Sequence, residues 1–207
     1  VKDTFYKRAK AVSTLRAILD EAGYTEVETP TLQNIPGGAS ARPFITHFNA
    51  LNQQMYCRIA TELYLKRLIV GGFEGVYEIG KNFRNEGMDR THNPEFTCME
   101  LYVQYKDYNW MMEFTERMLE RICIAVNGKP ETVVDGKTIS FKAPYRRLPI
   151  LDAIKEQTGY DLSEMNEEEI RGVAQKLGIE VDESMGKGKL IDEIFGETCE
   201  GKFIQPT

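Results

Sequence analysis

The sequence predicts an α+β fold in which helices flank an antiparallel sheet and a small helical insertion follows. Apolar residues recur at helical spacing over residues 3–22, which indicates an amphipathic helix. Residues 76–84 and 96–104 alternate with period two, so we interpret them as the strands of a long antiparallel hairpin. From about residue 150 to 200 the pattern is helical and no apolar strand interrupts it, which indicates the insertion.

The composition is that of an ordinary globular domain. The chain has 207 residues, of which 42% are hydrophobic and 28% charged, enough for one domain with a core or one domain that carries an insertion. It has no run of 18 apolar residues, so we expect a cytoplasmic protein without a signal peptide or a membrane segment. The net charge of −6 argues against a general nucleic-acid binder.

The cysteines and the chain ends carry two further expectations. The four cysteines are scattered without a CxxC pair, which favours buried free thiols in a reducing cytosol over a zinc or redox site. We therefore expect no metal site in this chain. The first residue is Val1 rather than methionine, and Thr207 follows a segment without a closing helix. We expect both ends to be cuts in a longer chain.

The amino-terminal half begins with a helix and a short strand. Gly23 is a natural stop for helix 3–22, and the strand expected over residues 24–30 ends in a proline that cannot donate to a ladder. A second helix is expected over residues 61–70, with Thr61 as its N-cap.

A loop rich in small residues lies between these helices, at residues 35–44. Its Gly37-Gly38 pair allows the backbone to approach a ligand or another chain segment closely. Strand-like alternation then covers residues 45–59, with a turn expected at 49–52.

The carboxyl-terminal half is expected to contain helices and one tight hairpin. Residues 109–127 form an amphipathic pattern, and Asp135-Gly136 is a strong hairpin-turn signal. Residues 166–170 place three acidic side chains where a helix begins, which suits its dipole. Residues 190–195 belong to a further helix.

Period-two parity divides the side chains of the long hairpin between two faces. One face is mainly apolar and should pack on helices; it carries Tyr77, Ile79, Phe83, Met99, Leu101 and Val103, with Lys81 and Thr97. The other face is polar; it carries Glu78, Gly80, Asn82, Arg84, Glu86, Cys98, Glu100, Tyr102 and Gln104. Parity alone leaves open which residues are directly opposed.

The polar face is either solvated or lines a polar pocket. Solvation is the ordinary state of such a face, but three details favour a pocket. Surface strands favour Lys and Thr, which this face lacks. Gly80 weakens a strand unless something approaches it closely. The connection over residues 85–95 also concentrates His, Arg, Asn and Glu side chains.

Several blocks of this sequence resemble the class II aminoacyl-tRNA synthetases, and in particular their lysyl branch. Motif 2 of that family is resembled by FRNE at 83–86, HNPEF at 92–96 and MELY at 99–102. Motif 1, the dimer-interface element, is resembled by the first helix, Gly23 and VETP at 27–30. The lysyl enzymes are also matched by IPGGASARPF at 35–44 and by ELYLKRL at 62–68.

This resemblance implies the domain organisation. It implies a class II synthetase-like antiparallel sheet in a catalytic core over residues 1–148, with motif 1 at about 15–31 and motif 2 at about 76–104. Residues 149–207 are then a helical insertion that leads back toward the remainder of the catalytic domain.

The resemblance also implies a function, a lysine–tRNA ligase that activates lysine with ATP and transfers it to tRNA(Lys). It makes Arg84 the catalytic residue, which holds the α-phosphate of ATP and the lysine carboxylate. A guanidinium suits this task because its fork geometry matches both oxyanions. The implied ATP contacts are Arg84, Glu86, His92, Asn93 and Phe96, with Phe96 stacked on adenine. Taken alone, Phe96 would be interpreted as a core aromatic.

Lysine carries two cationic groups, so its pocket needs carboxylates at both ends. The resemblance implies that Glu100 and Tyr102 bind the ε-ammonium group, and that Glu62 and the carbonyl of Gly38 bind the α-ammonium group. Outside this motif, Glu62 would be an ordinary helix-surface carboxylate and Glu100 the partner of a neighbouring base.

Compared with a whole enzyme of this family, the sequence has no motif 3, no anticodon-reading OB-fold and none of the downstream acidic residues that hold Mg²⁺. We therefore expect the chain alone to be inactive, and the parent protein to form a homodimer through the motif 1 helix and strand. Two alternatives stay open at this stage. One is a lysyl-synthetase paralogue that modifies a protein, and the other is a non-catalytic synthetase-like dimerisation module.

Overall fold

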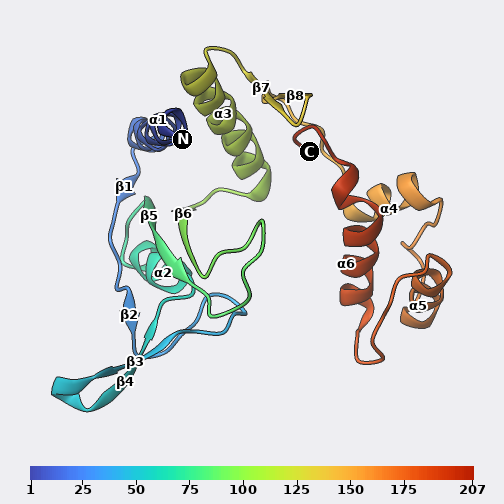
Figure 1. Cartoon of the computed structure of the whole chain (residues 1–207), viewed down its shortest axis with the longest axis horizontal. Coiled ribbons are helices and arrows are strands. Elements are labelled where there is room, and N and C mark those ends of the chain that lie inside the picture. Colours follow the sequence, from blue (N-terminus) through green and yellow to red (C-terminus); the bar gives the residue numbers. More distant parts are fainter. The chain divides into compact units, whose positions relative to one another are not determined.

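A computed structural model describes residues 1–207, and the chain divides into two compact units, Val1–Met111 and Met112–Thr207 (Figure 1). Helices accompany antiparallel strand pairs in both units, which confirms the predicted α+β class. No helix combines the length and the apolar character that crossing a bilayer requires.

The first unit contains two helices and two three-stranded sheets. Its elements are α1 Lys2–Glu21, β1 Thr25–Glu26, β2 Leu32–Gln33, β3 Ile45–Phe48, a 3-10 turn at Asn49–Leu51, β4 Gln53–Cys57, α2 Glu62–Val70, β5 Gly75–Phe83 and β6 Glu95–Val103. One sheet has the order β1-β5-β6 and the other β2-β4-β3. The predicted strand–turn–strand at 45–59 is β3, the 3-10 turn and β4.

The long hairpin β5–β6 is present, and its register is now defined. Glu78 pairs with Glu100, Gly80 with Cys98 and Asn82 with Phe96. Since paired residues share a face of the sheet, those members of the predicted polar set that lie within β5 and β6 share one face.

The predicted strand over residues 24–30 is mostly wrong. Only Thr25 and Glu26 pair, and they add β1 as a parallel edge to β5. The amide of Val27 donates one more bond to the Tyr77 carbonyl (2.9 Å), after which the chain leaves the ladder. Pro30 has no donor with which to rejoin it.

Helix α2 contacts both strands of the long hairpin (Figure 1). Its side of the hairpin is the polar face, because Gln104 Nε2 donates to the Ile69 carbonyl (3.1 Å) and the Lys66 ammonium lies 6.0 Å from the centre of the Tyr102 ring. Thr61 occupies the N-cap position as predicted, but its side chain makes no capping hydrogen bond, and its hydroxyl is buried without a partner.

Helix α1 contacts the apolar face of the hairpin. The Tyr77 hydroxyl donates to Asp20 (2.8 Å), and Arg8 donates to Thr97 (3.1 Å). Tyr77 is fully buried, and burial together with the nearby carboxylates raises its pKa well above the ordinary value.

The second unit contains a small hairpin and a three-helix cluster. Its elements are α3 Tyr108–Asn127, whose first turn precedes the unit boundary, β7 Glu131–Val134, β8 Lys137–Ser140, α4 Ile150–Thr158, α5 Glu167–Lys176, α6 Lys187–Thr198 and a 3-10 turn at Glu200–Lys202. The predicted turn between β7 and β8 is confirmed. Asp135 and Gly136 have φ values of 49° and 77°, the left-handed backbone that a two-residue hairpin turn needs.

Helices α4, α5 and α6 enclose an apolar core, with Ile154, Ile170, Leu190 and Ile194 fully buried. The acidic start of α5 forms a capping box, in which Asn166 Oδ1 accepts from the Glu169 amide (3.0 Å) and the Glu169 carboxylate accepts from the Asn166 amide (2.8 Å).

Candidate functional site

Arg58, which follows β4, forms a buried ion pair with Glu78 on the polar face of the hairpin. Arg58 also donates to the carbonyls of Lys81 (2.8 Å) and Thr29 (3.1 Å). Glu78 accepts from the Thr29 hydroxyl (2.6 Å) and amide (3.2 Å). The network satisfies both buried charges, as burial of ions requires, and connects Thr29, in the segment after β1, to β5.

Gly80 is glycine because this arginine lies against it. A Cβ at this position would stand 2.2 Å from Arg58 Nη2. The predicted close approach is therefore present, and the approaching group is a side chain of the protein.

Arg84 directly follows β5, on the polar face. Its backbone amide donates to the Pro94 carbonyl (2.8 Å), which closes the hairpin loop, and its Nε donates to the Ile59 carbonyl (3.4 Å). The guanidinium carbon lies 5.2 Å from the centre of the Phe96 ring, a cation–π arrangement.

All five residues that the resemblance assigns to ATP line one cavity of about 240 Å³. Its walls are Arg84, Glu86, Gly87, Thr91, His92, Asn93 and Phe96. The cavity combines a guanidinium, an aromatic ring and hydrogen-bonding side chains, which suits a nucleotide with its phosphate. We call it the nucleotide cavity.

One carboxylate organises the loop that forms a wall of this cavity. Asp89 Oδ1 accepts from the amides of Thr91 and His92, both at 2.7 Å, and Asp89 Oδ2 lies 2.8 Å from His92 Nδ1. These hydrogen bonds, first among them the one from the Thr91 amide, hold the pKa of Asp89 well below its usual range. Because a carboxylate only accepts, the shared proton sits on Nδ1, and Nε2 is the nitrogen left for a ligand.

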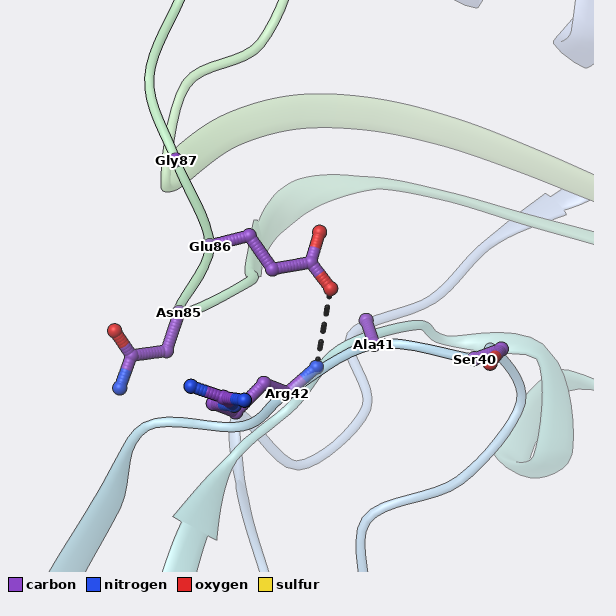
Figure 2. A pocket seen from close by; sticks show the side chains of 6 residues that line it. All are labelled: Ser40, Ala41, Arg42, Asn85, Glu86 and Gly87. Carbon is purple, nitrogen blue, oxygen red and sulfur yellow. Dashed lines mark hydrogen bonds between the residues drawn. The ribbon is translucent and has the colours of Figure 1, made fainter. Parts of the chain in front are cut away.

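Glu86 is turned toward the loop at 35–44. Its Oε1 accepts from the Arg42 amide (3.2 Å), and the Asn85 amide donates to the Arg42 carbonyl (2.7 Å), as Figure 2 shows for the first of these bonds. The two loops on either side of Glu86 are thus joined through backbone groups.

Glu100 and Tyr102 lie further along the polar face. Glu100 accepts from the Tyr102 hydroxyl (3.1 Å) and from the Thr61 amide at the start of α2 (3.3 Å). Burial, followed by the charge of Glu100, raises the pKa of Tyr102 well above its ordinary value, so the phenol stays protonated.

The start of α2 brings Glu62 and Gly38 together. A Cβ at Gly38 would lie 3.2 Å from the Cβ atoms of Ala60 and Glu62, and its φ of +88° also favours glycine. The Glu62 carboxylate accepts a hydrogen bond from Lys66, one turn along the helix. The Gly37-Gly38 pair therefore permits a close approach between chain segments, one of the two possibilities that the sequence left open.

Three residues of this site were missed by the sequence analysis: Arg42, Arg58 and Asp89. Arg58 sits between β4 and α2, where no period assigns a side-chain direction. Asp89 had a local signal, because Asp two residues before Thr favours a side-chain turn. In the whole described chain, no three His, Cys, Asp or Glu side chains are grouped so that they could hold a metal ion.

A long antiparallel hairpin whose polar face carries an arginine, an aromatic ring and two directly opposed glutamates fits the resemblance to the class II synthetases. The chain belongs to that class, since the family model described as tRNA synthetases class II (D, K and N) matches residues 1–185.

Within this family, the chain is similar to curated proteins that carry one enzyme name. The chain is 66% identical over 207 residues to a protein of Porphyromonas gingivalis strain W83, 64% identical to one of Christiangramia forsetii and 60% identical to one of Azobacteroides pseudotrichonymphae, each named Lysine--tRNA ligase. All of this chain is covered in each comparison, but only 36%, 36% and 41% of the respective relative. The chain thus spans little more than a third of the relatives that it matches.

Proposed function

We propose that this chain forms the substrate-selecting part of the active site in an enzyme that activates lysine with ATP and transfers it to tRNA(Lys). The observation that carries the proposal is the single polar face of β5–β6. The nucleotide cavity opens at one end of this face, and the Glu100–Tyr102 pair lies toward the other.

In the activation step, a carboxylate oxygen of lysine attacks the α-phosphorus of ATP, the bond to the bridging oxygen breaks, and pyrophosphate leaves. In this proposal the Arg84 guanidinium contacts both the carboxylate and the phosphate and offsets negative charge that builds up as they react. Phe96 offers a ring face to adenine, and Glu86, His92 and Asn93 contact the nucleotide. In the second step a hydroxyl of the tRNA terminus attacks the lysyl carbonyl and AMP leaves.

The lysine side chain is selected by charge. Glu100, with the Tyr102 hydroxyl bound to it, receives the ε-ammonium group, and Glu62 with the Gly38 carbonyl receives the α-ammonium group. A site built to hydrogen-bond a polar substrate group rejects analogues that lack it by roughly 10⁴-fold or more.

The remaining proposals concern the whole protein. Mg²⁺ bound to the nucleotide would help to neutralise its phosphates, and its protein ligands would come from outside these 207 residues, as would motif 3. The protein acts in the cytoplasm, as a homodimer through α1 and the strand after it. Residues 149–207 are an insertion in the catalytic domain.

Residues 1–207 alone should bind lysine and ATP more weakly than micromolar. Micromolar binding in isothermal titration would contradict this.

The proposed reaction is tested by ATP–pyrophosphate exchange on the full-length protein that carries this sequence. Exchange should depend on lysine and not on aspartate or asparagine. Exchange stimulated by aspartate or asparagine but not by lysine would overturn the substrate assignment. A paralogue that modifies a protein would show lysine-dependent exchange without charging tRNA(Lys), so charging is measured alongside.

A further inference from the structure

A second cavity adjoins the nucleotide cavity and has no role in the reaction described so far. It measures about 510 Å³ and is lined by Ser40, Ala41, Arg42, Asn85, Glu86 and Gly87 (Figure 2). Glu86 and Gly87 line both cavities. The two cavities therefore lie on either side of Glu86 and Gly87, and a ligand that occupies both has to pass these two residues.

The backbone of Arg42 is fixed while its side chain is available. Its carbonyl and amide are bonded to the Asn85 amide and the Glu86 carboxylate. Its guanidinium is exposed and makes no hydrogen bond or ion pair. Other arginines without a carboxylate partner have another contact, as Arg8 does with Thr97 and Arg84 with the Phe96 ring; the Arg42 guanidinium has neither.

The other polar groups of the cavity are compatible with an anion. In Figure 2 the Arg42 guanidinium and the Asn85 amide extend to the same side of the two loops. Glu86 carries the only carboxylate in the lining, and it is turned toward the Arg42 backbone amide, which offsets part of its charge. Ser40 adds a hydroxyl, and Ala41 and Gly87 add no charge to the lining.

We propose that this second cavity is a phosphate-binding subsite in which Arg42 and Asn85 hold a phosphate group of a substrate that extends beyond the nucleotide cavity. The proposal rests on the proposed function, which supplies two such phosphates. One is in the triphosphate tail of ATP, and the other is in the sugar–phosphate backbone at the acceptor end of tRNA. A guanidinium suits either, because it presents several N–H donors to phosphate oxygens.

Two variants of the full-length protein test the subsite, Arg42→Gln, which removes the charge, and Arg42→Lys, which keeps it. The control is Lys137→Gln, which removes one positive charge from an exposed position on β8. Three quantities are measured: the KM for ATP in pyrophosphate exchange, the KM for tRNA(Lys) in charging, and the affinity for inorganic tripolyphosphate.

Arg42→Gln should weaken tripolyphosphate binding roughly tenfold, as loss of a charged phosphate contact does, with Arg42→Lys closer to wild type and Lys137→Gln unchanged. A rise of similar size in the KM for ATP alone assigns the phosphate to the triphosphate tail. A rise in the KM for tRNA, with the slope of log affinity against log salt reduced by about 1, assigns it to tRNA.

The subsite is overturned if Arg42→Gln leaves both KM values and the tripolyphosphate affinity within twofold of wild type. Failure of the proposed reaction is a separate result. A wild-type protein without lysine-dependent exchange would refute the reaction, while tripolyphosphate binding to wild type and Arg42→Gln would still decide the subsite.

Discussion

At the scale of single residues, Gly80 gives the sharpest test of how the polar face is built. Gly80→Ala places a methyl group against the Arg58 guanidinium, so either the strand bends or the buried Arg58–Glu78 pair separates. Overpacking and disruption of a buried pair together predict a loss of at least about 2 kcal/mol in the free energy of unfolding. Urea denaturation followed by circular dichroism measures this.

Gly87→Ala is the matched control, because a Cβ there would meet no atom within 4 Å. We expect it to change the free energy of unfolding by less than about 0.5 kcal/mol. Equal stability of the two variants would show that Arg58 does not press on Gly80.

At Asp89, two substitutions separate the contribution of the negative charge to ATP binding from that of the hydrogen bonds to the loop. Asp89→Ala removes the side-chain hydrogen bonds to Thr91 and His92 and leaves only the backbone bond from the Asp89 amide to the His92 carbonyl and the Thr91–His92 side-chain contact, so the KM for ATP should rise several-fold. Asp89→Asn keeps an acceptor for the two backbone amides and should preserve most of the affinity. Because the folded pKa of Asp89 is lowered, the order it gives the loop is present above the unfolded pKa and is lost only as the pH falls through the folded value.

Because Asp89 stays ionised at neutral and mildly acidic pH, the KM for ATP of the wild-type protein should show no titration of Asp89 in this range. A wild-type KM that depends on a group titrating near pH 4, and that loses this dependence in Asp89→Asn, would contradict the lowered pKa.

Some residues of the site could be predicted from the sequence, and others could not. Arg84, Glu100 and Tyr102 could be placed on one face because strand alternation has a fixed period of two. Arg58 could not, since its direction depends on a short irregular segment and on which strands lie beside it. Gly80 was flagged correctly as a point of close approach, but the identity of the approaching group is a tertiary property.

At the scale of elements, the capping box of α5 is an isolated feature that can be measured. Asn166→Ala removes the side-chain acceptor of the Glu169 amide, so we expect a loss of about 1 kcal/mol in the free energy of unfolding. Asn166→Asp keeps an acceptor at the N-terminus of the helix dipole and should be close to neutral. Thermal unfolding of both variants compares them, and an Asp variant as unstable as the Ala variant would contradict the capping role.

The elements that were predicted well are those specified by their own sequence. The two-residue turn at Asp135-Gly136 and the acidic start of α5 each contain their own hydrogen-bonding groups or backbone preference. The strand predicted at 24–30 was too long. Its length depends on pairing with β5, which is distant in the sequence, and only Thr25 and Glu26 pair with β5.

At the scale of the whole molecule, the proposed dimer predicts that the exposed apolar residues of α1 become buried in the interface between two copies. Phe5 and Tyr6 are 67% and 63% exposed, and burial against a second copy would remove this apolar surface from water. In the full-length protein, Phe5→Asp should shift sedimentation velocity toward the monomer. Val133→Asp, at a position on β7 that is 62% exposed, is the control and should leave the dimer intact; an intact dimer in Phe5→Asp would refute this interface.

The central claim is that one face of the β5–β6 hairpin holds lysine and ATP at separate places. Glu100→Gln tests it most directly, because this change removes the charge that we propose binds the lysine ε-ammonium group, at a residue that does not line the nucleotide cavity. In ATP–pyrophosphate exchange by the full-length protein, we predict that the KM for lysine rises at least about 30-fold, the effect of losing one partner of a buried charge pair. The KM for ATP should stay within about threefold of wild type, since Glu100 does not line the nucleotide cavity. An equal rise in both KM values, or no rise in the KM for lysine, would contradict the account.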